Sequence, residues 1–210
     1  MKIEKQVEEN YYKFCKLEGN NYIASEFALL TIAKIIRKFQ VQSVLEIGLG
    51  IGSISDTVLK MAKVSNLNLR YAGTEANEFC KEALKSNVEF YSGIEMFENI
   101  SDIDINNKFD LIIIDGQDDT LEKIISLCSD RAIIFIEGDR SPQAEKIISY
   151  FPGAQFVQVI TLQKNRIYSP GNPNFYVGGG RVIFINPDLN MKIYCLKEKV
   201  ATYLKRYLRK

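Results

Sequence analysis

A run of apolar residues ends in a carboxylate and passes at once into three glycines at alternating positions. The carboxylate is Glu46, and the glycines are Gly48, Gly50 and Gly52, followed by Ser53 at the start of a helical pattern. The segment predicts a strand, a tight turn and a helix N-terminus, because glycine permits positive φ and lets a ligand approach the backbone closely. The helix N-terminus adds free N–H donors and the positive end of the helix dipole. We therefore predict a small-molecule site here.

The spacing of these glycines separates two classes of cofactor. A dinucleotide fingerprint, GxGxxG, would place its third glycine at position 53, where this chain has Ser53. The acidic side chain of Glu46, directly before the loop, would also repel a pyrophosphate. Both features disfavour an NAD-dependent oxidoreductase and favour a ligand with a positively charged end.

Acidic residues end several of the strand-like segments. They are Glu46, Glu75, Asp115, and the pair Glu137 and Asp139. The carboxyl ends of parallel strands meet at one edge of an open sheet, and ligands bind there. So many carboxylates at one edge would be costly unless a cationic or hydroxyl-bearing ligand offset them. The pattern favours a ligand that carries a positive charge and a ribose.

Strands alternate with helical patterns along most of the chain. Strands are predicted at 44–46, 69–74, 88–91, 109–114, 131–136, 155–162 and 181–185, and helices at 1–20, 22–39, from 53 on, at 77–86, at 119–128 and from 141 on. Ser53 and Asp56 have the spacing of a capping box, and Ser141 with Pro142 predicts an N-cap and a first helical position. The last two strands have no helix between them, which predicts an antiparallel pair at one edge.

These elements predict an α/β fold: a doubly wound, mostly parallel, seven-stranded Rossmann-like sheet with an antiparallel last strand. The 210 residues suffice for a single domain with a sizeable core. We divide it into a helical lead-in at 1–40, a Rossmann-like core at 41–186 and a basic C-terminal helix at 187–210.

The motifs LEIGLGIG and FDLIIIDG, the acidic Glu75 and the terminal strand pair resemble class I S-adenosylmethionine-dependent methyltransferases over residues 22–186. Within that family, the LEIG and IIIDG motifs and the helical lead-in are similar to small O-methyltransferases of the catechol type. The resemblance implies an enzyme that transfers the methyl group of S-adenosylmethionine to a small-molecule hydroxyl by in-line displacement. A cofactor-binding partner or regulatory protein without turnover is the alternative from another class, and the oxidoreductase is the less favoured one.

The resemblance also implies which residues hold the cofactor. Glu46 and the glycine backbone would hold the methionine end, Glu75 would accept hydrogen bonds from both ribose hydroxyls, and residues 92–95 would flank the adenine. The implied set is Glu46, Gly48, Gly50, Gly52, Ser53, Glu75, Ala76, Ser92, Gly93 and Asp115. Plainer interpretations stay open: a tight turn for the glycines, a solvated residue for Glu75, and a simple turn for Ser92 and Gly93.

Asp115 is the candidate catalytic residue, as a general base or as a metal ligand. In the metal-dependent catechol-type enzymes, an Asp after the fourth strand and an Asp-Asn pair after the fifth bind magnesium. The resemblance thus implies a site for Mg²⁺ or another divalent cation at Asp115, Glu137 and Asp139. This chain has Glu137-Gly138-Asp139 in place of Asp-Asn, and Asp118 where those enzymes carry a basic residue. Helix capping is the plainer interpretation of Asp118 and its neighbour Asp119.

Composition excludes several other classes of chemistry. Histidine is absent, which removes imidazole as a base, nucleophile or metal ligand. The net charge of +1 gives no general nucleic-acid signal, and the chain lacks the Asn-Pro-Pro-Tyr type of tetrapeptide used in amino methylation of bases. The cysteines are far apart, which argues against a thiolate zinc site. With a charged N-terminal segment and no run long enough to span a membrane, we expect a cytoplasmic protein.

Two segments lie outside the cofactor motifs. The connection at 164–180 is rich in Gly, Pro, Asn and Tyr, and is either a lid or specificity element or an ordinary surface loop. Residues 196–210 form a basic amphipathic helix. Such a helix either makes weak contact with an anionic membrane surface or docks on its own domain or on another subunit, as in a homodimer.

Overall fold

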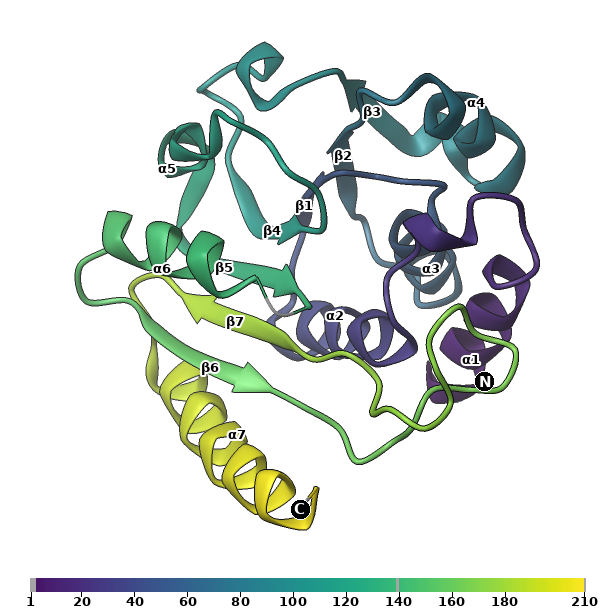
Figure 1. Cartoon of the computed structure of the whole chain (residues 1–210). Coiled ribbons are helices and arrows are strands. Elements are labelled where there is room, and N and C mark those ends of the chain that lie inside the picture. The colour runs from purple at the N-terminus through teal and green to yellow at the C-terminus, as the bar shows by residue number, and fades with distance from the viewer. Residues whose placement is uncertain (1–2, 139, 210) are drawn as a thin grey trace.

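The computed structural model describes residues 3–138 and 140–209, which form a seven-stranded sheet with helices on both faces (Figure 1). The strands are β1 Ser43–Ile47, β2 Arg70–Thr74, β3 Ile94–Phe97, β4 Phe109–Ile114, β5 Cys128–Glu137, β6 Gln155–Val159 and β7 Gly180–Phe184. The helices are α1 Ile3–Phe14, α2 Glu26–Phe39, α3 Ser53–Val64, α4 Glu78–Asn87, α5 Ile124–Leu127, α6 Ser141–Tyr150 and α7 Leu189–Leu208. Short 3₁₀ turns are η1 Asn20–Tyr22, η2 Tyr91–Gly93, η3 Ile100–Asp102 and η4 Leu121–Lys123.

The strand order is β3-β2-β1-β4-β5-β7-β6. The first five strands along the chain run parallel, and β7 lies antiparallel between β5 and β6. This confirms the predicted doubly wound sheet with an antiparallel last strand. The chain leaves β1 toward β2 and β3 and then returns to β4, so the strand order reverses between β1 and β4, where open sheets of this kind bind ligands.

Alternate residues of the central strands enter two separate buried clusters. Val44 and Leu111 pack under α2, α3 and α4, whereas Leu45 and Ile112 pack under α5 and α6. Successive strand residues point to opposite faces, so a strand covered on both faces must be apolar throughout. This explains the unbroken apolar run of β4, whose bounds match the prediction.

The prediction of a third strand at 88–91 was wrong, because β3 begins at Ile94. Val88 is buried, but its contacts lie at the end of α4. A Cβ added at Gly52 would collide with its side chain. The apolar character of this stretch therefore serves packing between α4 and the glycine turn, and the strand follows after η2.

The predicted capping box at the start of α3 was also wrong. The N-cap is Gly52, in the left-handed region with φ 98°, and the Ser53 hydroxyl accepts a hydrogen bond from Ala24 N at 3.1 Å. Asp56 is fully buried and pairs with Lys13 and Lys60, at 3.0 and 2.9 Å. Its carboxylate therefore joins α3 to α1. The helix predicted at 119–128 is shorter, consisting of η4 and α5, because β5 already begins at Cys128.

The long connection between β6 and β7 is held against the N-terminal helices. Arg166 pairs with Glu26 at 3.0 Å and with Glu8 at 2.9 Å, and Gln163 also donates to Glu26. The rings of Tyr12 and Tyr168 meet edge to face. These contacts fix the loop beside α1 and α2.

Helix α7 covers the edge of the sheet formed by β6. Its side chains donate hydrogen bonds to carbonyls of alternate edge residues: Cys195 to Phe156 O, Thr202 to Gln158 O and Lys205 to Ile160 O. An uncovered edge strand would offer these groups to other chains. Helix α7 therefore docks on its own domain, but not through the apolar residues predicted to dock: Leu196, Val200 and Tyr203 are exposed, and the contacts come from the opposite face of the helix. Within the described part of the chain, no helix is long and apolar enough to cross a membrane.

Candidate functional site

A cavity of about 720 Å³ opens at the carboxyl ends of β1, β2, β4 and β5. Such a volume is in the usual range for small-molecule sites. Its walls come from the glycine turn after β1, the residues after β2, β3, β4 and β5, and η1 of the lead-in. The structure therefore places a pocket at the reversal of strand order, where the sequence motifs converge.

The glycine turn is shaped by close contacts with other segments. Gly48 has φ 86°, and a Cβ added there would lie 2.6 Å from Gly116 Cα in the turn after β4. A Cβ on Gly50 would collide with the carbonyl oxygen of Tyr22. Glycine is needed at these two positions because the turns after β1 and β4 and the lead-in meet backbone to backbone. Gly48 and Gly50 also line the cavity.

Glu75 lies on the cavity wall with a fixed side chain. One carboxylate oxygen accepts a hydrogen bond from Gly50 N at 2.7 Å, and the other accepts from Asn77 N at 2.8 Å. Each carboxylate oxygen has a second lone pair available. Glu75 and its neighbour Ala76 therefore present acceptor oxygen and backbone to the cavity beside the glycine turn. The role of Glu75 in binding a ribose stays a prediction.

Glu46 has a different environment from the one expected. Only 1% of its surface is exposed, and it lies outside the residues that line the cavity. One oxygen accepts a short hydrogen bond from the Tyr71 hydroxyl, whereas Oε1 has no partner among the described residues. Burial, followed by the charges of Asp115 and Glu75, raises the pKa of Glu46 well above its usual value. Its unpartnered oxygen is a buried acceptor behind the cavity wall.

Replacing this carboxyl by an amide is expected to change the pH dependence of stability. The pKa of Glu46 is raised in the folded state above its ordinary value of 4.5. The free energy of unfolding of the parent protein therefore falls as the pH rises above 4.5, because the unfolded chain loses this proton first. Glu46→Gln removes this decrease in stability. The difference in free energy of unfolding between variant and parent should therefore increase from near zero at about pH 4 to roughly 1–3 kcal/mol at about pH 7. Urea unfolding measures it, and a difference independent of pH would contradict the assignment.

Asp115, Glu137 and Arg140 form the polar floor of the cavity. Arg140 Nη2 lies 3.3 Å from Asp115 Oδ1, and the guanidinium also donates to the carbonyls of Asp115, Gly116 and Glu137 at 2.5, 3.0 and 3.2 Å. Burial and the charge of Glu137 raise the pKa of Asp115 to about 8, opposed by Arg140. Burial also raises the pKa of Glu137. Arg140 thus pairs with the carboxyl group of Asp115 and with the backbone carbonyl of Glu137, whereas the Glu137 carboxylate accepts a hydrogen bond from Ser25 N at 3.4 Å. Burial favours the protonated form of both carboxyl groups.

The predicted metal site is only partly within the described structure. Asp139 lies outside the described residues, and residues 3–138 and 140–209 contain no group of three His, Cys, Asp or Glu side chains arranged to hold a metal ion. Beside Asp115, the positive charge is supplied by Arg140. The metal site at Asp115, Glu137 and Asp139 stays a prediction. Asp118, predicted to cap a helix, accepts hydrogen bonds from Thr120 and from Ile100 N.

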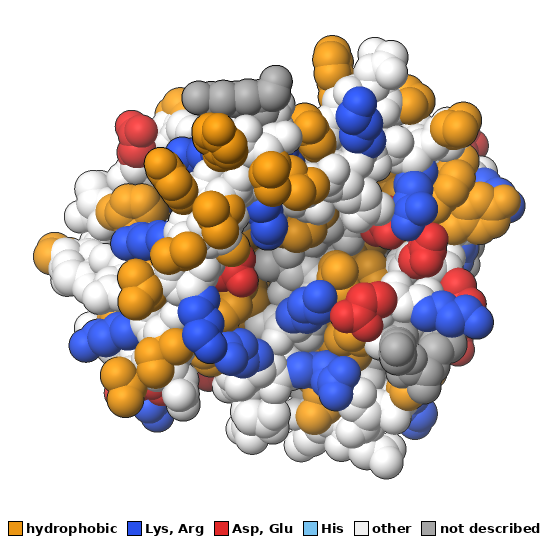
Figure 2. Space-filling view, turned by 90° about the horizontal axis from the view of Figure 1, so that it is seen from below, with side chains coloured by type: hydrophobic (Ala, Val, Ile, Leu, Met, Phe, Trp, Pro, Cys, Tyr) orange, Lys and Arg blue, Asp and Glu red, His pale blue; other side chains and the backbone are white. Residues whose placement is uncertain are grey.

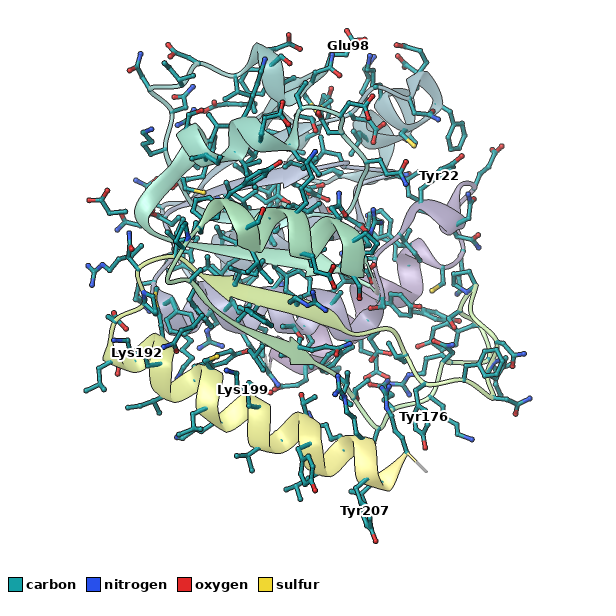
Figure 3. The ribbon with its side chains drawn as sticks, turned by 60° about the vertical axis from the view of Figure 1, so that its left-hand side comes forward. Tyr22, Glu98, Tyr176, Lys192, Lys199 and Tyr207 are labelled. Carbon is teal, nitrogen blue, oxygen red and sulfur yellow. The ribbon has the colours of Figure 1, made fainter. Side chains whose placement is uncertain are left out.

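Several wall residues were not predicted from the sequence. Asn21 and Tyr22 come from η1, Glu98 and Asn99 follow β3, and Arg140 follows β5. Tyr22 and Glu98 lie at the same end of the molecule in Figure 3, opposite α7. The break at Gly19-Asn20-Asn21 was the only signal for the first pair.

The other predicted cofactor residues differ in their position. Ser53 is buried behind the glycine turn. Ser92 and Gly93 precede β3, so they lie at the amino end of a strand whose carboxyl end faces the cavity. The misplaced third strand caused this error, and the residues after the true strand are Glu98 and Asn99. No described residue of the loop at 164–180 lines the cavity.

The cavity wall is strongly acidic. Its described residues include six acidic side chains and one basic side chain: Glu75, Glu98, Asp115, Asp118, Asp119, Glu137 and Arg140. In a partly enclosed site, charges of one sign raise the local concentration of ligands of the opposite sign. The wall therefore favours a cationic ligand and disfavours a pyrophosphate.

Comparison with known proteins supports the fold. No protein-family model matches the chain, and no curated protein sequence matches it. Solved structures of methyltransferases are among those similar to it. An O-methyltransferase from Bacillus cereus in complex with S-adenosylhomocysteine has 15% identity and a TM-score of 0.59, with 87% of this chain and 91% of that chain covered.

The second structure is the O-methyltransferase TomG from Streptomyces achromogenes, involved in tomaymycin synthesis, in complex with S-adenosylmethionine. It has 13% identity, a TM-score of 0.59, and 89% and 91% of the two chains covered. The third is a precorrin-6y C5,15-methyltransferase from Geobacter metallireducens, with 16% identity, a TM-score of 0.54 and coverages of 75% and 87%. At such identities the likeness establishes a shared fold.

Proposed function

Since the chain has the fold of class I S-adenosylmethionine-dependent methyltransferases, we propose that it is a methyltransferase acting in the cytoplasm on a small-molecule hydroxyl. The observation that carries the proposal is the acidic cavity at the reversal of strand order, with Glu75 fixed beside the glycine turn. S-adenosylmethionine has a sulfonium, an amine and a ribose, and this wall suits all three groups.

The residues have distinct roles in this proposal. When bound, the cofactor supplies an electrophilic methyl group. Glu75 accepts hydrogen bonds from the ribose hydroxyls, and the acidic wall holds the cationic end. Asp115 accepts the proton that the acceptor hydroxyl loses as its oxygen gains the methyl group. Arg140 holds Asp115 at the cavity floor through its side chain and its carbonyl.

A cofactor-binding protein without turnover is the second candidate. Two observations favour it. Asp118 occupies the position at which the catechol-type O-methyltransferases have a basic residue, and the candidate base Asp115 is already paired with Arg140. An NAD-dependent oxidoreductase is disfavoured because the acidic wall would repel the pyrophosphate.

A thermal-shift panel and a turnover assay together separate these candidates. S-adenosylmethionine and S-adenosylhomocysteine should raise the melting temperature, since a ligand that binds the folded state stabilises it. NAD should not, and each ligand is tested with and without magnesium. Formation of S-adenosylhomocysteine with a panel of catechols and other hydroxylated acceptors would support the enzyme. Stabilisation without turnover on any acceptor would favour the binding protein, and stabilisation by NAD alone would overturn both.

A further inference from the structure

Helix α7 has a continuous apolar stripe on the face turned away from its own domain. The stripe follows alternating steps of four and three residues, which keep side chains on one side of a helix. Its members are Leu189, Ile193, Leu196, Val200, Tyr203 and Tyr207, joined by Leu204 and Leu208, and each is between 43% and 74% exposed. Figure 3 shows Tyr207 pointing away from the domain. An apolar patch of this extent is unusual on a soluble surface and marks a contact site.

The opposite face of α7 is already used. Cys195 and Thr202 are buried and donate hydrogen bonds to β6 carbonyls. Tyr194 packs edge to face against Phe39 and Phe184, with ring centroids 5.6 Å apart in both pairs. The helix is therefore fixed to the domain along its length, and its outer face is presented by a rigid support.

Basic residues flank the stripe on both sides. Lys192, Lys199 and Arg206 recur at seven-residue intervals along one side, and Lys197 lies on the other; all four are exposed. The only acidic residue of α7, Glu198, is half-buried outside the stripe. Figure 2 shows the hydrophobic and basic side chains side by side on this underside of the molecule.

The flanking charges decide which occupant fits the stripe. The spacing of the stripe would suit the contact between two helices of a coiled coil. In a parallel pair, however, Lys192 of one copy would lie beside Lys197 of the other, and in an antiparallel pair the basic residues on the same side of the two stripes would lie beside each other. Both arrangements bring like charges together. At an anionic lipid surface, the acyl chains can bury the apolar stripe, and the negatively charged headgroups can pair with the basic residues on both sides of it. We propose that α7 lies in the interface of an anionic phospholipid membrane.

This arrangement is compatible with access to the cavity. The helix is about 30 Å long and would lie flat, with its domain on the aqueous side. The cavity residues Tyr22 and Glu98 lie at the opposite end of the molecule from α7 (Figure 3). The proposal is independent of methyl transfer, and its test needs no turnover.

The test is co-sedimentation of the full chain with vesicles of phosphatidylcholine alone or mixed with phosphatidylglycerol. We expect binding to the anionic vesicles and loss of that binding as salt is added. Lys192→Gln with Lys199→Gln should lower partitioning by about fivefold per charge removed. Leu196→Ser with Val200→Ser should lower it by at least about tenfold. Ile105→Ser is the matched control, because Ile105 is an equally exposed apolar residue outside α7, at 65%.

Three results would overturn the proposal. They are absence of binding to anionic vesicles, equal binding to phosphatidylcholine alone, or equal binding by the α7 variants. Sedimentation velocity without lipid tests the other occupant. A dimer of the parent chain that Leu196→Ser with Val200→Ser dissociates would assign the stripe to a second copy.

Discussion

Replacing Asp115 by asparagine is expected to reduce turnover by about 10²- to 10⁴-fold, the usual contribution of a positioned general base. Asparagine has a similar size and keeps an oxygen for Arg140, which lies 3.3 Å from Oδ1. The fold and the affinity for S-adenosylmethionine should therefore remain. Turnover is measured as S-adenosylhomocysteine formation, and affinity by calorimetry.

Asp119→Asn is the matched control for this substitution. Asp119 is exposed on the wall of the same cavity, so Asp119→Asn makes the same chemical replacement on that wall but leaves the base in place. Retained activity in Asp115→Asn, or an equal loss in both variants, would remove the proposed role of Asp115.

The pH profile gives a second readout of the same residue. Burial and the charge of Glu137 raise the pKa of Asp115 to about 8, which favours the protonated form of Asp115 at neutral pH. A base must be deprotonated to act, and kcat/KM should therefore rise with pH and level off above about 8. A flat profile would contradict a base with this pKa.

Glu75→Gln is expected to weaken the binding of S-adenosylmethionine by about 100-fold. A hydrogen bond to a charged group contributes about 1.5–3 kcal/mol, and the amide can accept with one oxygen only. The amide NH2 group, which cannot accept, would also face the N–H of Gly50 or of Asn77, both of which donate to the parent carboxylate. Calorimetric titration measures the change.

Glu78→Gln provides the control for cofactor affinity. Glu78 is exposed in the first turn of α4 and pairs with Lys81 at 2.9 Å. Because Glu78 lies outside the cavity wall, the affinity of the Glu78→Gln variant for S-adenosylmethionine should match that of the parent. An adenosine analogue without the two ribose hydroxyls is a further probe. If Glu75 binds those hydroxyls, this dideoxy analogue should bind the parent and Glu75→Gln with equal affinity.

The sequence predicted most elements well because their signals are local. The apolar run of β4 and the glycine turn after β1 each depend on residues adjacent in the chain. The side chain of Asn77, the first residue of the predicted helix at 77–86, likewise accepts a hydrogen bond from backbone three residues ahead, at Cys80 N. The third strand was missed for a nonlocal reason: Val88 is apolar because it packs against Gly52, 36 positions earlier in the chain.

The position of the site was predicted from the sequence, whereas the partners of its acidic residues were found only in the structure. Acidic residues at the ends of β2, β4 and β5 do meet in one cavity, as parallel strands require. The partners of those acids could not be inferred, since Arg140 reaches Asp115 across 25 positions of sequence. Tyr22 reaches the glycine turn in the same way, through the packing of the lead-in.

The sequence by itself determined the order of the elements, the parallel sheet with its antiparallel partner, the position of the glycine turn, and the acidic character of the pocket. Only the tertiary structure decided that Glu46 is buried behind the wall, that Arg140 binds the acidic floor, and that α7 docks one face and exposes the other. The reason is physical. Local backbone preferences and periodicity act within one element, whereas burial, ion pairing and exposure depend on which elements pack together.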